Sequence, residues 1–233
     1  MKNLILNLPI KAFCTTAALA TLFLTGCKQK QTEFDAGGTL EAVTLTVSAY
    51  GNGNILWLHG QEGTQVQKGQ LLGYTDTMPF YLQKKALAAT RTHTPGPALD
   101  AQMDQVQYMI DNCRIISPIS GTIINRYAQG GELAYAGKPL FRIADLDTMQ
   151  LKAYVTAKRL SDLKLNQEVQ VFSLQGEKEV FYRGRLIYIA DHAEFTPKSV
   201  QTQSERENLV YAVKIAVKND GFLKIGMHGE VIF

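Results

Sequence analysis

Two spacings of apolar residues alternate along the chain, and each predicts a different kind of element. Between residues 97 and 114 the apolar positions recur at steps of four and three, at Leu99, Met103, Val106, Ile110 and Cys113. This spacing places one side chain per turn on a single helix face, as in a coiled-coil seam. From Gln150 onward apolar and polar residues alternate, which is typical of strands with one buried face. The pattern therefore predicts mostly β-structure interrupted by a short helical segment.

The helical segment, residues 78–114, is predicted to be a hairpin of two antiparallel helices. Pro79 suits the first turn of the first helix, where its missing N–H is not needed. The run Thr94-Pro-Gly-Pro97 breaks the helical pattern and predicts the bend between the helices. We expect roughly twelve to fifteen residues in each helix, so the hairpin reaches only about 20 Å.

The segments on either side of this hairpin are two copies of one pattern, Gly-x9-Gly-x5-Gly-x2-Leu. The copies contain Gly53, Gly63, Gly69 and Leu72, and then Gly121, Gly131, Gly137 and Leu140. A constant offset of 68 residues aligns them without a gap. About 30 residues of strand cannot bury a core alone, so we expect residues 48–77 and 115–145 to pack on each other as a β-sandwich. Trp57 lies in an alternating strand and is expected in that core.

The remaining residues, 146–233, are predicted to form a small β-barrel that is closed or nearly closed. Alternation predicts strands at 150–155, 168–174, 180–190, 209–217 and 229–233, with a short helix at 157–164. A further strand, 39–47, precedes the first repeat. The expected fold class is mainly β, with a short α-helical hairpin.

Residues 1–26 resemble a lipoprotein signal peptide. The mostly apolar run 12–24 is too short to span a bilayer as a helix, and Leu24-Thr-Gly is followed directly by Cys27. We therefore expect cleavage before Cys27, lipid on this cysteine and a polar tether at 27–38. The alternative is an ordinary secretory leader with an incidental cysteine. Without the leader's Lys2 and Lys11, 22 basic residues oppose 21 acidic ones, which gives no electrostatic case for nucleic acid.

Residues 38–233 resemble the membrane fusion protein, or HlyD, family of periplasmic adaptors. The resemblance is carried by "VSAYGNGNILWLHGQEGTQVQKGQLLG", "CRIISPISGTIINRYAQGGELAYAGKPLFRIADLDTMQLKAYV" and "LKIGMHGEVIF". It implies a lipoyl-like (biotinyl-lipoyl) sandwich split by a coiled-coil hairpin, followed by a barrel. It also implies a periplasmic, lipid-anchored bridge between an inner-membrane transporter, here of the ABC type, and a TolC-like outer-membrane channel.

The resemblance further implies self-association into a ring, commonly of six copies, for which we expect contacts near Gly63 and Gly131. The hairpin is shorter than those that reach an outer-membrane channel, and its tip lacks the family's Arg-x3-Leu-x6-Ser pattern. The pump-facing role is therefore better supported than docking on a channel. At the tip, Arg91 and His93 are the candidate partner contacts.

Two other functions stay open. A lipoyl or biotin carrier domain of an enzyme would need an exposed lysine at a hairpin turn, whereas Lys84 and Lys85 fall within a predicted helix as solvated charges. The other open function is that of a lipoprotein that binds a ligand or stabilises the envelope without any pump.

No catalytic residue, metal site or cofactor is predicted. The histidines share no ligand spacing; they are His59, His93, His192 and His228. Asp191, His192 and Glu194 have no nucleophile motif beside them and are interpreted as polar loop residues.

Overall fold

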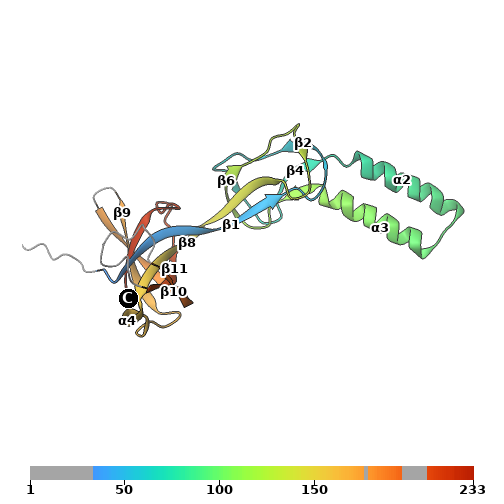
Figure 1. Cartoon of the computed structure of the whole chain (residues 1–233). Coiled ribbons are helices and arrows are strands. Elements are labelled where there is room, and N and C mark those ends of the chain that lie inside the picture. The colour runs from blue at the N-terminus through green and yellow to red at the C-terminus, as the bar shows by residue number, and fades with distance from the viewer. Residues whose placement is uncertain (1–33, 176–177, 196–208) are drawn as a thin grey trace, which may run out of the picture. The chain divides into compact units, whose positions relative to one another are not determined.

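A computed structural model describes residues 34–175, 178–195 and 209–233 (Figure 1). The predicted leader, Cys27 and most of the tether lie outside these residues. The strands are β1 (Ala36–Ser48), β2 (Gly53–Leu58), β3 (Gln65–Val66), β4 (Leu71–Thr75), β5 (Arg114–Ile116), β6 (Gly121–Arg126), β7 (Leu133–Ala134), β8 (Pro139–Thr156), β9 (Glu168–Gln175), β10 (Lys178–Phe195), β11 (Leu209–Lys218) and β12 (His228–Ile232). The helices are α2 (Met78–His93), α3 (Pro97–Asn112) and α4 (Ala157–Leu160).

The two repeat copies are joined by reciprocal hydrogen bonds, in which each copy donates to the other. The N–H of Gly63 donates to the carbonyl of Ile123 at 2.8 Å, and the N–H of Gly131, 68 residues later, donates to the carbonyl of Ile55 at 2.7 Å. The N–H groups of these two isoleucines donate in turn to the turns at Thr64 and Glu132. Because each copy completes the other's hydrogen bonding, the halves form one folded unit, as predicted.

The sandwich core repeats the same symmetry. Its fully buried side chains include Ile55 and Leu72 from the first copy and their equivalents Ile123 and Leu140 from the second. At the turns, Gly63 and Gly131 have φ values of 88° and 90°, a conformation that favours glycine. The glycine spacing is therefore shared because both copies form the same kind of turn, and these glycines are not incidental loop residues.

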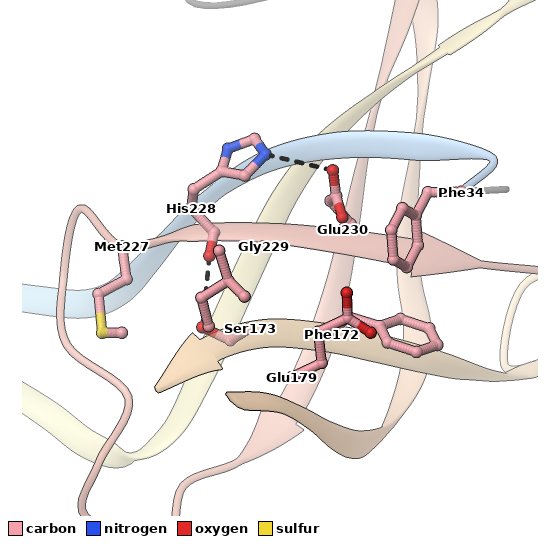
Figure 2. A pocket seen from close by; sticks show the side chains of 9 residues that line it. Phe34, Phe172, Ser173, Glu179, Met227, His228, Gly229 and Glu230 are labelled. Atoms are coloured by element: carbon pink, nitrogen blue, oxygen red, sulfur yellow. Dashed lines mark hydrogen bonds and ion pairs between the residues drawn. The ribbon is translucent and has the colours of Figure 1, made fainter. Parts of the chain in front are cut away.

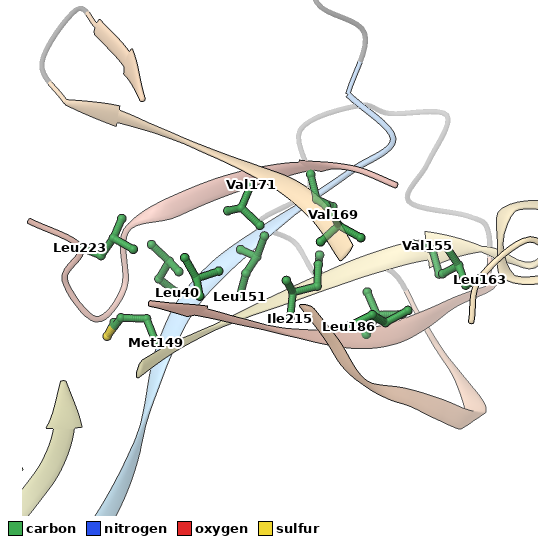
Figure 3. Packing of buried hydrophobic residues seen from close by; sticks show 14 residues of the cluster. Leu40, Met149, Leu151, Val155, Leu163, Val169, Val171, Leu186, Ile215 and Leu223 are labelled. Atoms are coloured by element: carbon green, nitrogen blue, oxygen red, sulfur yellow. The ribbon is translucent and has the colours of Figure 1, made fainter. Parts of the chain in front are cut away.

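The barrel is closed. The strand order β1-β12-β9-β10-β11-β8 returns to its start because β1 also pairs with β8. The pairing of Ala36 with Val231 joins the two ends of the described chain in one sheet. Figure 3 shows the side chains that fill the interior, among them Leu40, Leu151 and Ile215, all fully buried.

The strands β1 and β8 belong to both the sandwich and the barrel. The sheet register pairs residues 43–48 of β1 with the first part of β8, and residues 38–42 with its second part, across a β-bulge. The predicted boundary between residues 145 and 146 therefore falls inside one continuous strand. The predicted strand at 39–47 also extends to Ala36 and Ser48. Alternation alone could not place this boundary, because both parts share a two-residue period.

A second repeat, which the glycine spacing of the first did not reveal, lies within the barrel. Leu163-Lys-Leu-Asn166-Gln and Leu223-Lys-Ile-Gly226-Met are related by an offset of 60 residues. Both turns have positive φ, 69° at Asn166 and 87° at Gly226. The Asn166 N–H donates to the carbonyl of Leu186 at 2.8 Å, and the Gly226 N–H donates to that of Leu40 at 2.7 Å. The repeated Leu-Lys dipeptide was the available signal.

This second repeat predicts how Asn166 responds to substitution. Asn166→Ala is expected to cost about 1 kcal/mol of unfolding free energy, because alanine is strained at positive φ, whereas Asn166→Gly should stay close to wild type. Urea unfolding of both variants measures the difference. Equal stability of the alanine and glycine variants would contradict the expectation.

Candidate interaction surfaces

The hairpin consists of two 16-residue helices that lie side by side (Figure 1). The predicted seam of α3 is its least exposed face, with Val106 buried and Leu99, Met103 and Ile110 partly buried. On α2 the partly buried positions are Phe80, Lys84 and Leu87, again at steps of four and three. The two seams therefore face each other, which is the packing that the spacing predicts.

Polar side chains also join the two helices. The Lys84 ammonium donates to Oε1 of Gln107, whose Nε2 donates to Oδ1 of Asp111. Nearer the tip, Arg91 Nε lies 2.9 Å from Asp100 Oδ1. Lys84 is thus held within the hairpin, which corrects the expectation of a solvated charge, and Arg91 has a partner in its own chain.

The two residues predicted to contact a partner at the hairpin tip, Arg91 and His93, differ in their surroundings. Arg91 is about half exposed and engaged with Asp100, whereas His93 is exposed at the last position of α2. Contact with a partner stays a prediction for both. For Arg91, such a contact would compete with the ion pair that ties the helix ends together.

Each helix carries charge of a single sign, a signal that the spacing of apolar residues does not contain. Between Met78 and His93 the formal charges are Lys84, Lys85 and Arg91, with no acidic residue; between Pro97 and Asn112 they are Asp100, Asp104 and Asp111, with no basic one. Lys85 and Asp104 are exposed. The hairpin thus has one basic and one acidic helix.

Large apolar side chains are exposed on the outer faces of both helices. Met78 and Leu82 on α2, and Tyr108 on α3, are each 57% exposed. The ring of Tyr108 lies edge-on to that of Tyr50, with centroids 5.7 Å apart, and its side-chain hydrogen bond raises the pKa of Tyr50. These faces suit contact with a partner better than contact with water.

The turns of the sandwich form a second candidate surface. A side chain built on Gly63 or Gly131 would meet open space, so both turns are accessible. Beside Gly131, the Lys138 ammonium lies 2.9 Å from Glu132 Oε2, and this hydrogen bond lowers the pKa of the Glu132 carboxyl. Whether these turns contact a neighbouring copy stays a prediction.

Trp57 is not in the core, contrary to expectation. Its side chain is 40% exposed and lies edge-on to Tyr74 on the outer face of the four-stranded sheet, with ring centroids 5.5 Å apart. The pairing of β2 with β4 shifts register between Ile55 and Trp57. This irregularity breaks the strict alternation, so a two-residue period counted from Ile55 places Trp57 on the wrong face.

The candidate chemical groups do not converge on a reactive site. Among the described residues, no group of three or more His, Cys, Asp or Glu side chains is placed to hold a metal ion. His192 Nε2 lies 3.8 Å from Glu194 Oε1, beyond hydrogen-bond distance. For a carrier function, Lys84 and Lys85 both lie within α2 rather than at a strand turn.

A shallow hollow of about 210 Å³ lies on the barrel between β9 and β12 (Figure 2). The rings of Phe34 and Phe172 meet edge-on at its apolar end, with centroids 4.8 Å apart. At its polar end, His228 Nε2 lies 3.9 Å from Glu230 Oε1, an ion pair only when the histidine is protonated. The apolar lining could hold a small nonpolar group.

None of the helices in the described ranges is long and apolar enough to cross a membrane.

Part of the chain is similar to a known protein family. Residues 43–146 match the family model described as "RND MFP, barrel-sandwich hybrid domain". A UPF0194 membrane protein of Yersinia enterocolitica is 32% identical over 125 residues, which are 53% of this chain and 38% of that protein. A UPF0194 membrane protein of Yersinia pseudotuberculosis is 30% identical over 128 residues, 54% of this chain and 39% of that protein. The chain thus spans less than half the length of the curated relatives it matches.

Solved structures share the fold. A chimera of MacA and MexA, containing the α-hairpin domain of Pseudomonas aeruginosa MexA, superposes with a TM-score of 0.67 at 22% identity, covering 84% of this chain and 78% of that one. MacA from Actinobacillus actinomycetemcomitans gives a TM-score of 0.54 at 21% identity, covering 84% and 76%. At such identities the similarity concerns the fold, and it confirms the predicted sandwich split by a helical hairpin.

Proposed function

We propose that this chain is the periplasmic adaptor of an export system, because residues 43–146 match the model of the barrel-sandwich hybrid domain of membrane fusion proteins. It works without catalysis, by linking an inner-membrane transporter to other parts of the envelope. The observation that carries the proposal is the reciprocal closure of the two half-motifs, each donating from Gly63 or Gly131 to the other half. This closure makes one folded unit to which both the helical hairpin and the barrel are attached.

Each part has a role in this proposal. Lipid on Cys27 keeps the chain at the inner membrane, and several copies associate into a ring. The barrel contacts the transporter, which we propose to be of the ABC type because the chain resembles the adaptors that accompany ABC-type exporters. Each 16-residue helix spans about 24 Å, so the hairpin extends the adaptor toward an outer-membrane channel without a long reach.

The alternative functions receive no comparable support. A carrier domain presents its modified lysine at an exposed strand turn, whereas here Lys84 is hydrogen-bonded to Gln107 between two helices. The hollow beside Phe34 and His228 is shallow, and its two walls are ordinary strands of the barrel. A pump-independent lipoprotein is distinguished from the adaptor by its partners.

The proposal is tested by capturing the partners of the tagged, full-length chain from native envelopes after chemical cross-linking. We expect an inner-membrane ATP-driven permease as the main partner, and an outer-membrane channel in smaller amount, since the hairpin is short. Mass spectrometry identifies both. As a control for cross-linking that depends only on proximity, an unrelated tagged lipoprotein is treated in the same way and should capture neither.

Two results would contradict the adaptor function. One is capture of envelope proteins without any transporter, which would favour the pump-independent lipoprotein. The other is an intact mass that carries a lipoyl or biotinyl group on Lys84 or Lys85, which would favour the carrier.

A further inference from the structure

The predicted tether from Cys27 enters the fold at Phe34, beside the hollow on the barrel. The ring of Phe34 meets that of Phe172 on β9 edge-on, with centroids 4.8 Å apart (Figure 2). The ring of Phe172 meets that of Phe181 on β10 in the same way, at 4.2 Å. The first described residue of the chain is therefore one end of a row of three aromatic rings.

This row lies on the outer surface of the barrel. Val169 and Val171 of β9 belong to the barrel core, so the two-residue period of a strand turns Phe172 outward. The sheet register places Phe181 directly opposite Phe172. Although it faces outward, Phe172 is buried, because Phe34 and Phe181 pack against it.

Two large apolar side chains on this face are exposed to water. Phe181 is 58% exposed, and Leu174, two residues beyond Phe172 on β9, is 60% exposed. Because side chains two apart on a strand share a face, Leu174 lies on the same outer surface. We call the surface formed by Phe34, Phe172, Leu174 and Phe181 the aromatic patch. Apolar groups gathered in this way are typical of a surface that a partner covers.

Charged side chains of both signs border the aromatic patch. On β10, Glu179 and Arg183 lie two residues before and after Phe181, and both are exposed. On β12, Glu230 pairs with Phe172 in the sheet register. Binding to a strongly anionic surface calls for a cluster of basic residues, which the described border of the patch does not provide. A partner without net charge fits this surface better.

Asp35 fixes the point at which the tether enters the fold. Its N–H donates to the carbonyl of Val231 at 2.9 Å, and its Oδ2 accepts from the N–H of Phe233 at 2.9 Å. The Arg159 guanidinium of α4 pairs with the same carboxylate. The neighbouring Phe34 is thus held at the barrel surface.

The length of the tether limits how the barrel can turn above a membrane. Cys27 and Phe34 are seven residues apart, so at most about 25 Å of chain separates them. This reach is less than the diameter of a small domain, which is about 30 Å. Lipid on Cys27 would therefore keep the aromatic patch close to the bilayer and hold the opposite side of the barrel, formed by β8 and β11, away from it.

We propose that the aromatic patch lies on the surface of the lipid bilayer, with Leu174 and Phe181 inserted among the headgroups, when lipid on Cys27 anchors the chain. The inference rests on the lipid anchor of the proposed function and not on the identity of the transporter. Two apolar side chains bind a membrane too weakly to hold the chain alone, so the contact orients the barrel while the anchor retains it. The faces formed by β8 and β11 then stay free for a protein partner.

Tryptophan fluorescence tests the contact. The chain has a single tryptophan, Trp57 in the sandwich, so Phe181→Trp combined with Trp57→Phe places the only reporter in the patch. The mature, lipidated protein is reconstituted into phosphatidylcholine vesicles whose acyl chains carry bromine, a quencher, close to the headgroup. We expect the reporter to lose about half of its fluorescence relative to unbrominated vesicles, because an inserted interfacial side chain lies about 5–10 Å into the headgroup boundary.

The matched control places the reporter on the opposite side of the same barrel. Tyr154 is a partly buried aromatic residue on β8, which is three strands away from β9 in either direction round the closed barrel. Its neighbours in sequence, Ala153 and Val155, are buried, so Tyr154 faces outward. Tyr154→Trp combined with Trp57→Phe should stay unquenched in the same vesicles.

A charge placed in the patch should weaken the contact. Leu174→Asp, added to the reporter protein with Phe181→Trp, should lower the quenching at least about twofold, because a carboxylate resists transfer into the apolar part of the interface. Leu174 is exposed, so the fold should tolerate the change. Gln83→Asp, at an exposed position of α2, makes the same change in net charge and should leave the quenching unchanged.

Three results would overturn the proposal. An unquenched reporter at position 181 means that the bilayer does not reach the patch, and equal quenching at positions 181 and 154 means that the barrel has no preferred orientation. Emission from position 181 that is blue-shifted but unquenched means that protein, such as a second copy, covers the face.

Failure of this contact is distinguishable from failure of the proposed function. If the protein does not stay with the vesicles at all, the lipid anchor and the patch contact both fail. If it stays with the vesicles but the reporter in the patch is unquenched, the anchor stands without this contact. Capture of a permease tests the adaptor function independently of either result.

Discussion

Replacing Gly121 by alanine is expected to destabilise the sandwich by about 3 kcal/mol, a large part of the stability of a domain this size. A Cβ on Gly121 would lie 2.3 Å from the carbonyl oxygen and 2.8 Å from the carbonyl carbon of Ala144. Both are backbone atoms of β8, the neighbouring strand, so no rotamer change can relieve the overlap. The strand has to move away, and its paired hydrogen bonds with β1 and β6 are strained with it.

The matched control is the equivalent glycine of the first repeat. A Cβ on Gly53 would meet its nearest atom, the carbonyl oxygen of Asp76, at 3.5 Å, which is ordinary contact. Gly53→Ala should therefore change the unfolding free energy by less than about 1 kcal/mol. Denaturant unfolding of both variants gives the comparison. If the two substitutions cost the same, the packing of β6 against β8 is looser than described.

The second large effect concerns the membrane anchor. Cys27→Ser is expected to move the mature chain from the membrane fraction to the soluble periplasmic fraction, because serine cannot carry the thioether-linked lipid. Acyl chains contribute about 0.8 kcal/mol per buried CH₂, so losing several chains lowers membrane partitioning by orders of magnitude. Fractionation followed by immunoblotting measures the shift.

Cys14→Ser is the control for this experiment, because Cys14 lies in the apolar part of the predicted leader. The control protein should stay with the membrane. A Cys27→Ser protein that also remains membrane-bound would show that another contact holds the chain there, and the predicted lipoprotein anchor would be wrong.

The repeat was the part of the fold that the sequence revealed best, since its signal is local in each copy. Gly63 and Gly131 keep their spacing because the same turn needs positive φ in both halves. The seam of α3 could be predicted for a similar reason, because it follows from the local helical period, and Val106 is buried where that period places it. The weaker barrel repeat around Asn166 and Gly226 shares fewer residues, and it was overlooked.

The candidate interaction surface was harder to predict. The single-sign charge of each helix is visible in the sequence, but which charges are available for a partner is not. Lys84 and Lys85 are neighbours in the chain, yet only Lys84 is bound to Gln107 and only Lys85 is exposed on the outer face. The register between the helices decides this, and it becomes known only when their contacts are known.

By itself, the sequence determined the features that arise from local periodicity: a β-rich chain, two equivalent half-motifs and a helical hairpin between them. Tertiary structure alone decided which distant strands pair, as when β1 closes the barrel by joining both β12 and β8. It also decided that Gly53 tolerates a side chain while Gly121 does not, and that Trp57 faces outward. The physical reason is that periodicity fixes how a segment folds locally, whereas close approach and exposure depend on segments far away in the chain.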